Sequence, residues 1–147
     1  DVVLIDDADL YLVEGRSWTS QPHGYTSYAR ASTKYPGSRK TLTLRMHRLI
    51  MSAAPGVGVD HRNGNGLDNR RENLRLADQS QNQANAHRTR GRSHYKGVTR
   101  NHGRWVAQTT RHRKCVYLGA YDTEEEAALA YDVYARGAFG EFARTNF

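Results

Sequence analysis

The chain has 147 residues and carries 22 basic against 15 acidic side chains, which gives a formal net charge of +7. That length holds one ordinary domain or two small ones, and the positive charge suits a polyanionic partner. The only cysteine, Cys115, excludes an internal disulfide, and we expect no zinc because a structural zinc site takes four Cys or His ligands. No apolar run is long enough to span a membrane and no signal peptide is visible, so we expect a cytoplasmic protein that is not secreted.

The N-terminal third predicts small structural elements. Residues 2–5 form an apolar run typical of a short strand, and an acidic turn follows it. Weak alternation over residues 25–31 and 41–46, with turn residues between them, predicts a hairpin. The hairpin leads into a short helix that is predicted over residues 47–54. We interpret His47, at its start, as a packing or supporting residue rather than a catalytic one.

Residues 59–82 contain the polar pattern around which the chain is organised. Asp60 and His61 end a short apolar run, and neighbouring side chains of a strand point to opposite faces, so one can bind a metal while the other faces a water. Asn73 follows twelve residues after His61, beyond a loop rich in Asn and Gly, and Asn82 follows nine residues later. A helix that begins shortly before Asn82 would let this side chain face Asp60. One Asp and one Asn oxygen form a sparse, hard ligand set that suits a single Mg²⁺ or Mn²⁺.

The Asp-His pair, the Asn-Gly-Asn-Gly-Leu-Asp-Asn loop, the Arg-Glu-Asn-Leu-Arg run and the later Asn82 resemble, in order and spacing, the homing-endonuclease branch of the HNH nucleases. The resemblance covers residues 41 to about 85 and implies a ββα-metal fold. It implies that His61 is the general base and that Asp60 and Asn82 bind one Mg²⁺ or Mn²⁺. It also implies that Asn73 holds the hairpin and orients His61.

Alternatives remain open within this pattern. Asn85 and His87 could replace Asn82 as the second protein ligand of the metal. Taken singly, each residue of the set is more often structural than catalytic, and Asn-Gly runs usually mark only a turn. The combination at this spacing favours a nuclease.

Basic residues dominate the middle of the chain. No acidic side chain lies between Asp78 and Asp122, whereas nine Lys and Arg residues do. Cations without counter-charges repel one another unless they meet phosphates, so this interval predicts contact with a nucleic-acid backbone. Residues 87–92 contain no apolar side chain, and we predict that they form a basic linker along the phosphates.

The last third of the chain alternates first like a sheet and then like a helix. Strands are predicted at residues 95–100, 104–110 and 114–118, with turns between them. A capping box opens a helix at Thr123, and the helix is predicted to end near Gly137. This alanine-rich helix would cover one face of the sheet and leave the other face open, polar and partly aromatic.

The motifs Tyr-Lys-Gly-Val, Gly-Arg-Trp-Val-Ala and Tyr-Leu-Gly, the acidic helix start and the terminal Asn-Phe resemble the apetala/ethylene-response-factor type of DNA-binding domain over residues 93–147. The resemblance implies that the exposed sheet face reads double-stranded DNA. Together with the basic middle, it gives these candidate DNA-binding residues: Arg88, Arg90, Arg92, Lys96, Thr99, Arg100, Arg104, Gln108, Thr110 and Tyr117.

These patterns predict an α+β chain of two modules. Residues 1–86 would form a ββα-metal nuclease domain with an N-terminal β-hairpin support and a catalytic core at about 41–86. After the linker at 87–92, residues 93–147 would form a small three-stranded antiparallel sheet packed on one helix. The expected function is a metal-dependent, site-directed DNA endonuclease of the homing type, which nicks as a monomer on DNA in a bacterial or phage-infected cell and has no membrane partner. The alternative is a DNA-binding regulator whose nuclease module is decayed.

Overall fold

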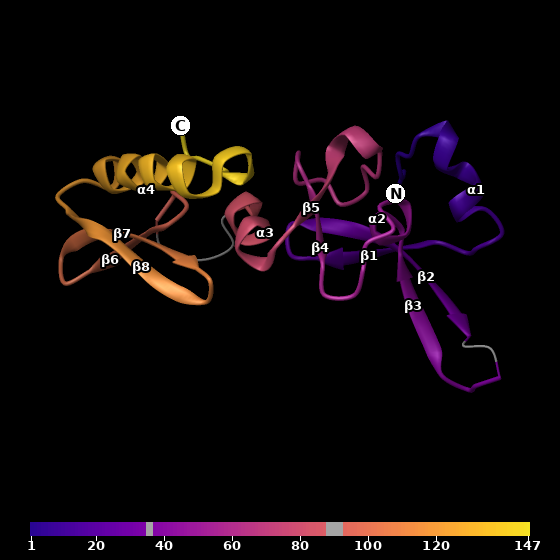
Figure 1. The fold of residues 1–147 in the computed structure, drawn as a ribbon. Helices are drawn as coiled ribbons and strands as arrows, with labels where there is room; N and C mark the ends of the chain where they lie inside the picture. The colour runs from indigo at the N-terminus through magenta and orange to yellow at the C-terminus, as the bar shows by residue number, and fades with distance from the viewer. Residues whose placement is uncertain (35–36, 88–92) are drawn as a thin grey trace. The chain divides into compact units, whose positions relative to one another are not determined.

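The computed structural model describes residues 1–34, 37–87 and 93–147, and the chain divides into two compact units, Asp1–Asp78 and Gln79–Phe147 (Figure 1). Both units combine short helices with small antiparallel sheets, so the α+β class expected from the sequence is confirmed. In the described residues no helix is long and apolar enough to cross a membrane.

The first unit begins with a three-stranded antiparallel sheet of β1 (Thr19–His23), β2 (Thr26–Lys34) and β3 (Thr41–Arg45). The predicted hairpin is present as β2 and β3. The sequence did not predict β1, because all five of its residues are exposed and no apolar alternation marks it. The helix α2 (Met46–Ile50) starts where expected but ends earlier, at Ile50.

The predicted strand at residues 2–5 is wrong. Leu4 forms only an isolated bridge with Asp68, and the chain continues into a 3₁₀ turn, η1 (Asp7–Asp9), and a short helix, α1 (Leu10–Val13). Three buried side chains of α1 and α2 meet in a small apolar core that also includes residues of β2 and β5; its buried members are Val13, Ala29, Met46, Ile50 and Leu74.

The polar segment of the first unit forms a two-stranded antiparallel pair, β4 (Gly58–His61) with β5 (Leu74–Ala77), joined through the 3₁₀ turn η2 (Arg71–Asn73). Its register sets Asp60 opposite Arg75 and His61 opposite Leu74. In α2 the guanidinium of Arg48 bonds the carbonyls of Ala53 and Ala54 at 3.0 and 2.8 Å. This arginine therefore holds the loop that leads into β4.

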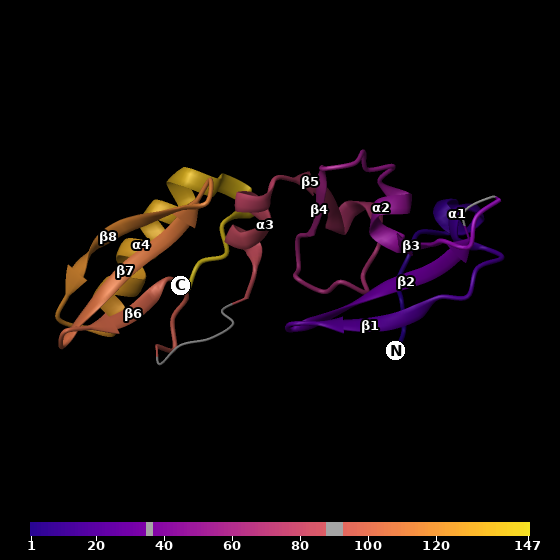
Figure 2. The same ribbon diagram turned by 90° about the horizontal axis from the view of Figure 1, so that it is seen from below.

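The second unit packs the helix α4 (Glu124–Phe139) against one face of the sheet β6 (Val98–Asn101), β7 (Arg104–Arg111) and β8 (Lys114–Tyr121), and Figure 2 shows this sheet from the side opposite α4. The predicted capping box is confirmed, with both Thr123–Glu126 bonds at 3.2 Å. The helix α4 ends at Phe139, which is buried, close to the predicted stop near Gly137, and a short turn, η3 (Gly140–Phe142), follows.

One glycine is required where this helix meets the sheet. Gly97 has a φ of +75°, and a Cβ there would lie 1.9 Å from the ring of Tyr131. Tyr131 itself is 1% exposed, and burial raises the pKa of its hydroxyl to about 12. Any larger residue at position 97 would displace the central ring of this core.

The short helix α3 (Gln79–Asn85) belongs to the second unit. Ala84 is 4% exposed and packs in one cluster with Tyr131 and Phe139. Ser80 accepts the backbone N–H of His112 at 2.9 Å, in the turn between β7 and β8. The helix therefore packs beside α4 within the second unit, although the HNH resemblance assigns it to the nuclease core. The domain limits expected from the sequence, 1–86 and 93–147, stay a prediction.

Candidate active site and nucleic-acid interface

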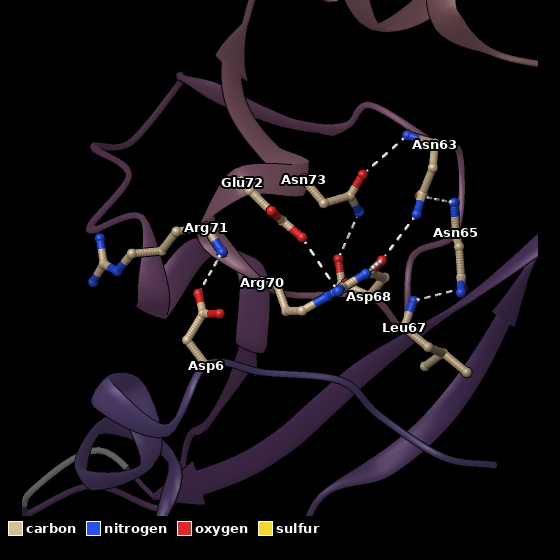
Figure 3. Close-up of polar contacts among 9 residues, drawn as sticks. All are labelled: Asp6, Asn63, Asn65, Leu67, Asp68, Arg70, Arg71, Glu72 and Asn73. Atoms are coloured by element: carbon tan, nitrogen blue, oxygen red, sulfur yellow. Dashed lines mark hydrogen bonds and ion pairs between the residues drawn. The ribbon is translucent and has the colours of Figure 1, made fainter.

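The loop that joins β4 to β5 is fixed by its own side chains (Figure 3). Asn63 donates to the Asp68 carboxylate at 2.9 Å, and its oxygen accepts from the backbone of Asn65 at 2.8 Å. Asn73 spans the loop, because its Oδ1 accepts from the Asn63 backbone at 3.0 Å and its Nδ2 donates to the Asp68 carbonyl at 2.7 Å. Such bonds replace the regular backbone pairing that the loop lacks. Asn73 therefore closes the loop that follows His61.

The N-terminal segment holds the same loop from a distant part of the sequence. Asn69 donates its backbone N–H to the carbonyl of Leu4 at 2.8 Å. Arg71 donates its backbone N–H to Asp6 at 2.8 Å (Figure 3), and its guanidinium forms a two-pronged bond with Asp9 at 2.7 and 2.8 Å. Asp9 is 2% exposed, so this ion pair is anchored in the interior.

Two carboxylates of this region are each paired with an arginine. Asp68 accepts from Nε and Nη2 of Arg70, both at 2.8 Å, and this pairing holds the pKa of Asp68 below its ordinary value. Asp60 accepts through Oδ2 from Nε and Nη2 of Arg75, at 2.8 and 2.7 Å. Both members of the second pair are 7% exposed, so the guanidinium compensates a charge that burial would otherwise penalise.

His61 ends β4 and is 4% exposed. Burial lowers the pKa of its imidazole, while the Asn69 amide and the carboxylates of Asp60 and Asp68 act in the opposite direction. The Asn69 side chain is fully buried, yet its amide atoms form no hydrogen bond of ordinary geometry within the described residues. With a lowered pKa, His61 is a neutral imidazole at neutral pH, which is the form that accepts a proton.

The donor chemistry of Asp60 fits a hard divalent cation. Magnesium usually binds through one or two carboxylates and completes its shell with water and phosphate oxygens. No three His, Cys, Asp or Glu side chains gather into a metal site within the part of the chain that the structure describes. A cation here would therefore depend on Asp60, amide oxygens, water and a phosphate. Asn82 lies in α3 of the second unit, and its role as a ligand stays a prediction, as do the alternatives Asn85 and His87.

The second unit presents an open sheet face opposite α4. The strand register gathers on this face Thr99, Val106, Gln108, Thr110, Cys115 and Tyr117. Tyr117 is 65% exposed, and the thiol of Cys115 lies 3.7 Å from the side-chain oxygen of Gln108. A β-bulge between Ala107 and Gln108 shifts the register without turning these side chains to the other face. The polar, partly aromatic face is present, and its contact with DNA stays a prediction.

Two arginines predicted to bind DNA have partners inside the second unit. Arg100 lies opposite Trp105 in the register, and its guanidinium is 5.3 Å from the centre of that ring, on the α4 side of the sheet. Arg104 pairs with Asp122 at 3.1 Å, and both side chains are more than half exposed. An exposed pair of this kind is weak, so Arg104 can exchange its partner for a phosphate or a base at little cost.

Lys96 is directed toward α3, where its ammonium group donates to the carbonyl of Ala84. It borders a cavity of about 190 Å³ that Gln83 and Gln108 also line. Three further predicted DNA contacts lie outside the described residues: Arg88, Arg90 and Arg92.

Sequence reasoning missed the residues that support the site from other elements. They are Asp9, Tyr28, Gly66, Asn69 and Arg75. Only Arg75 had a local signal, because it carries the charge opposite to that of Asp60 and faces it across the hairpin of β4 and β5. The sequence also holds a second interval without acidic residues, in addition to the one between Asp78 and Asp122. No acidic residue lies between Glu14 and Asp60, while seven Lys and Arg residues do.

Two family matches divide the chain in the same way as the two resemblances. Residues 45–84 match the HNH endonuclease family, and residues 93–141 match the AP2 domain family. The first match runs from the end of β3 into α3. The second covers the sheet β6–β7–β8 and all of α4.

Several similar proteins come from plants. Over 63 residues the chain is 52% identical to the AP2-like ethylene-responsive transcription factor PLT2 and 51% identical to the ethylene-responsive transcription factor WRI1, both of Arabidopsis thaliana. It is 52% identical to the AP2-like ethylene-responsive transcription factor CRL5 of Oryza sativa subsp. japonica. Each alignment covers 40% of this chain but only 11%, 15% and 10% of these proteins. The chain thus joins a segment similar to HNH endonucleases to a segment similar to AP2 domains.

Proposed function

We propose that the protein binds double-stranded DNA through the open face of β6–β7–β8. The support is the match to the AP2 domain and the plant relatives, whose names describe transcription factors. The physical reason is the face itself, which offers a glutamine amide, hydroxyl groups and an exposed tyrosine on a rigid sheet. Amide and hydroxyl groups can read base edges in the major groove, and a small sheet can enter that groove.

We further propose that the first unit is a metal-dependent endonuclease that hydrolyses one phosphodiester bond of the bound DNA. The observation that carries this proposal is a buried carboxylate, Asp60, next to a buried imidazole, His61, beside a loop that Asn73 closes. The match of residues 45–84 to the HNH endonuclease family supports it. One such site per chain would give a nick, and we retain the homing type and a monomer on DNA as part of this proposal.

Each residue has a defined task in the proposed reaction. His61, neutral at neutral pH, takes a proton from the water whose oxygen bonds to the phosphorus atom, while the bond from phosphorus to the leaving 3′ oxygen breaks. Asp60, held by Arg75, would supply the carboxylate that binds the divalent cation. A bound Mg²⁺ or Mn²⁺ would neutralise the charge that develops on the phosphate oxygens. Asn73 limits the freedom of the backbone after His61, so that the ring keeps one position.

A DNA-binding regulator with an inactive first unit is the second candidate. Two observations favour it: the relatives named above are transcription factors, and Arg75 occupies Oδ2 of the carboxylate that a metal would use. In that case the buried pair of Asp60 and Arg75 would be structural only. The two candidates share DNA binding and differ in whether the first unit cuts.

Incubation with supercoiled plasmid separates the two candidates. The endonuclease is expected to convert the plasmid to open circles with Mg²⁺ or Mn²⁺ and to leave it intact with a chelator. The His61→Ala variant, purified in the same way, must not cut the plasmid. If it does cut, the activity comes from a contaminating nuclease. If the protein shifts duplex DNA in a gel but leaves the plasmid supercoiled with every divalent cation tried, the regulator is the correct assignment.

A further inference from the structure

Three aromatic rings from three different elements meet at His61. Tyr28 comes from β2, His47 from α2 and His61 from β4. The ring centres of His47 and His61 are 5.1 Å apart, with their planes 88° from each other. Tyr28 contacts both, at 5.3 Å from His47 and 5.6 Å from His61. These separations lie within the range of attractive ring contacts, and the perpendicular arrangement is a preferred one.

Tyr28 is held in turn by the loop after β4. A Cβ on Gly66 would lie 2.5 Å from both Cδ1 and Cε1 of the Tyr28 ring, so this ring packs directly on the backbone of Gly66. The N–H of Gly66 donates to the hydroxyl of Thr26 at 2.7 Å, which ties the loop to the same strand. The loop that Asn73 closes therefore also fixes one of the rings that touch His61.

His47 is a costly residue to bury for stability alone. It is 4% exposed, and its Nδ1 has no hydrogen-bond partner within the described residues. A buried polar atom without a partner costs roughly 1–3 kcal/mol, which a leucine of similar volume would avoid. Burial, together with the nearby His61, Arg45 and Arg48, lowers the pKa of His47 to about 3, so this ring is neutral wherever the protein is folded at neutral pH. It therefore offers His61 a flat, uncharged ring.

We propose that His47 and Tyr28 are positioning residues that hold the imidazole of His61 in one orientation for proton transfer. This inference rests on the proposed nuclease function, since it assigns His61 the role of base. A side chain at the end of a strand can rotate about two bonds, and a general base needs one nitrogen fixed on its water. Two rings packed at its face and edge remove that freedom without contacting the substrate.

The test compares two substitutions of His47 that differ in shape but not in polarity. His47→Leu keeps the volume, removes the flat ring and also removes the unpartnered Nδ1. We expect it to be at least as stable as the wild type, yet to nick a labelled duplex about 10–100-fold more slowly under single-turnover conditions. His47→Phe keeps a ring edge toward His61 and should recover most of that loss. DNA affinity should be unchanged in both.

Two further variants keep the test decisive. Gly66→Ala pushes on the Tyr28 ring, and also on the backbone oxygen of Ser27, without changing any ring, and we expect a similar slowing of nicking. Tyr11→Leu is the matched control, because Tyr11 is 71% exposed on α1 and lies outside the ring cluster. A wild-type rate in His47→Leu, or a His47→Phe variant as slow as His47→Leu, would overturn the proposal. A purely structural role of His47 predicts that the nicking rate falls only if the stability of the protein falls. Slower nicking by a His47→Leu variant that keeps its stability would therefore exclude such a role.

Nuclear magnetic resonance of the metal-free protein tests the orientation of His61 independently of cutting. In the wild type the Cδ2 and Cε1 protons of His61 should give one sharp set of signals, displaced by the neighbouring ring currents. In His47→Leu these signals should broaden and move toward ordinary histidine values, whereas those of His94 should stay unchanged. If the plasmid assay fails but this change is seen, the nuclease function is refuted and the ring packing stands. If the His61 signals do not change, the positioning role is refuted.

Discussion

The two units bury different kinds of side chain. Among the described residues, the first unit places charged and polar groups around a small apolar cluster; they are Asp9, His47, Asp60, His61, Asp68, Asn69, Asn73 and Arg75. In the second unit the alanines of α4 pack on Val98 and Ala107, and its buried polar residues are Ser80, Asn85, Ser93 and Asp132. The first interior is expensive to form, because buried polar groups need partners, whereas the second resembles an ordinary apolar core.

This difference fits the functions proposed for the two units, in which the first holds reactive groups and the second presents a surface. A stable scaffold gains nothing from two buried imidazoles, one of them next to a carboxylate. A DNA-reading sheet needs only a rigid inner face, so that its outer face can vary. The following experiments test whether the buried polar groups of the first unit have the function that this comparison assigns to them, in order of expected effect.

The largest effect is expected for His61→Ala. General-base catalysis contributes about 10²–10⁴-fold, so we expect nicking of a labelled duplex to fall by that factor, while the gel shift with duplex DNA persists. Tyr11→Leu, in the same unit, should cut like the wild type. Equal cutting by His61→Ala and the wild type would remove the reactive role of the first unit.

The buried charge of Asp60 should be the most sensitive point for stability. Arg75→Met leaves that carboxylate without its counter-charge, which typically costs about 3–5 kcal/mol of unfolding free energy. In the second unit, Asp132 is held instead by neutral donors, the backbone of Phe147 and the backbone and side chain of Asn146, at 2.8–3.0 Å. Asn146→Ala removes only part of that set and should cost about 1–3 kcal/mol.

Urea unfolding, with amide hydrogen exchange to assign the loss to one unit, measures both changes. Each substitution should weaken protection mainly in its own unit. If Asn146→Ala lowered the unfolding free energy more than Arg75→Met, the first unit would not depend more than the second on the pairing of its buried charges.

The stability of the first unit should also depend on pH in a predictable direction. His47 stays neutral in the folded protein down to a pKa of about 3, whereas in the unfolded chain it takes up a proton near 6.5. Between these values the unfolded state binds more protons, so stability falls as the pH falls below 6.5, by about 1.4 kcal/mol per pH unit from this residue. Burial lowers the pKa of His61 as well, which acts in the same direction.

His47→Phe removes the contribution of His47 and should flatten this dependence. The unfolding free energy of both proteins, measured at pH 7 and pH 5, gives the two slopes. Identical slopes would mean that His47 is not the group responsible.

The smallest effect is expected on the outer face of the second unit. Gln108 can bond an adenine edge in two places, which contributes about 1–3 kcal/mol of discrimination against other bases. Binding sites are selected from random duplexes by the wild type and by Gln108→Ala. The variant should lose the base preference of the wild type at one position of the site only. Leu129→Ala, on the exposed side of α4, is the control. A Gln108→Ala variant that selects the same site as the wild type would place sequence reading on other residues.

Local features were the ones that the sequence could predict. The capping box at Thr123 and the hairpin of β2 and β3 each depend on one short stretch of the chain, and both are confirmed. The helix α4 ends at Phe139, just beyond Gly137, because the burial of Phe139 outweighs the modest helix penalty of the glycine. The strand β1 was missed, since its side chains are exposed and pair only through the backbone.

The candidate site shows the same division. Asp60, His61 and Asn73 stand out by type and spacing within one short segment. Their supports come from far along the chain: Arg71 bonds Asp9 across 62 positions, and the hydroxyl of Thr26 meets Gly66 across 40. No local pattern reports such contacts, because they exist only once the N-terminal sheet and the loop have packed together.

The position of α3 has a consequence for exchanging modules between proteins. The last residues that match the HNH endonucleases are also the ones that pack in the second unit, through Ala84 against Tyr131 and Phe139. A recombinant joined within the basic segment 87–92 would separate Ala84 from both partners and expose a helix face that is now covered. A successful graft would have to be joined between Asp78 and Gln79, so that the helix travels with its own support, or would have to rebuild that contact. The boundary at which the two units can be separated therefore lies before α3, and not in the segment that the sequence marks as a linker.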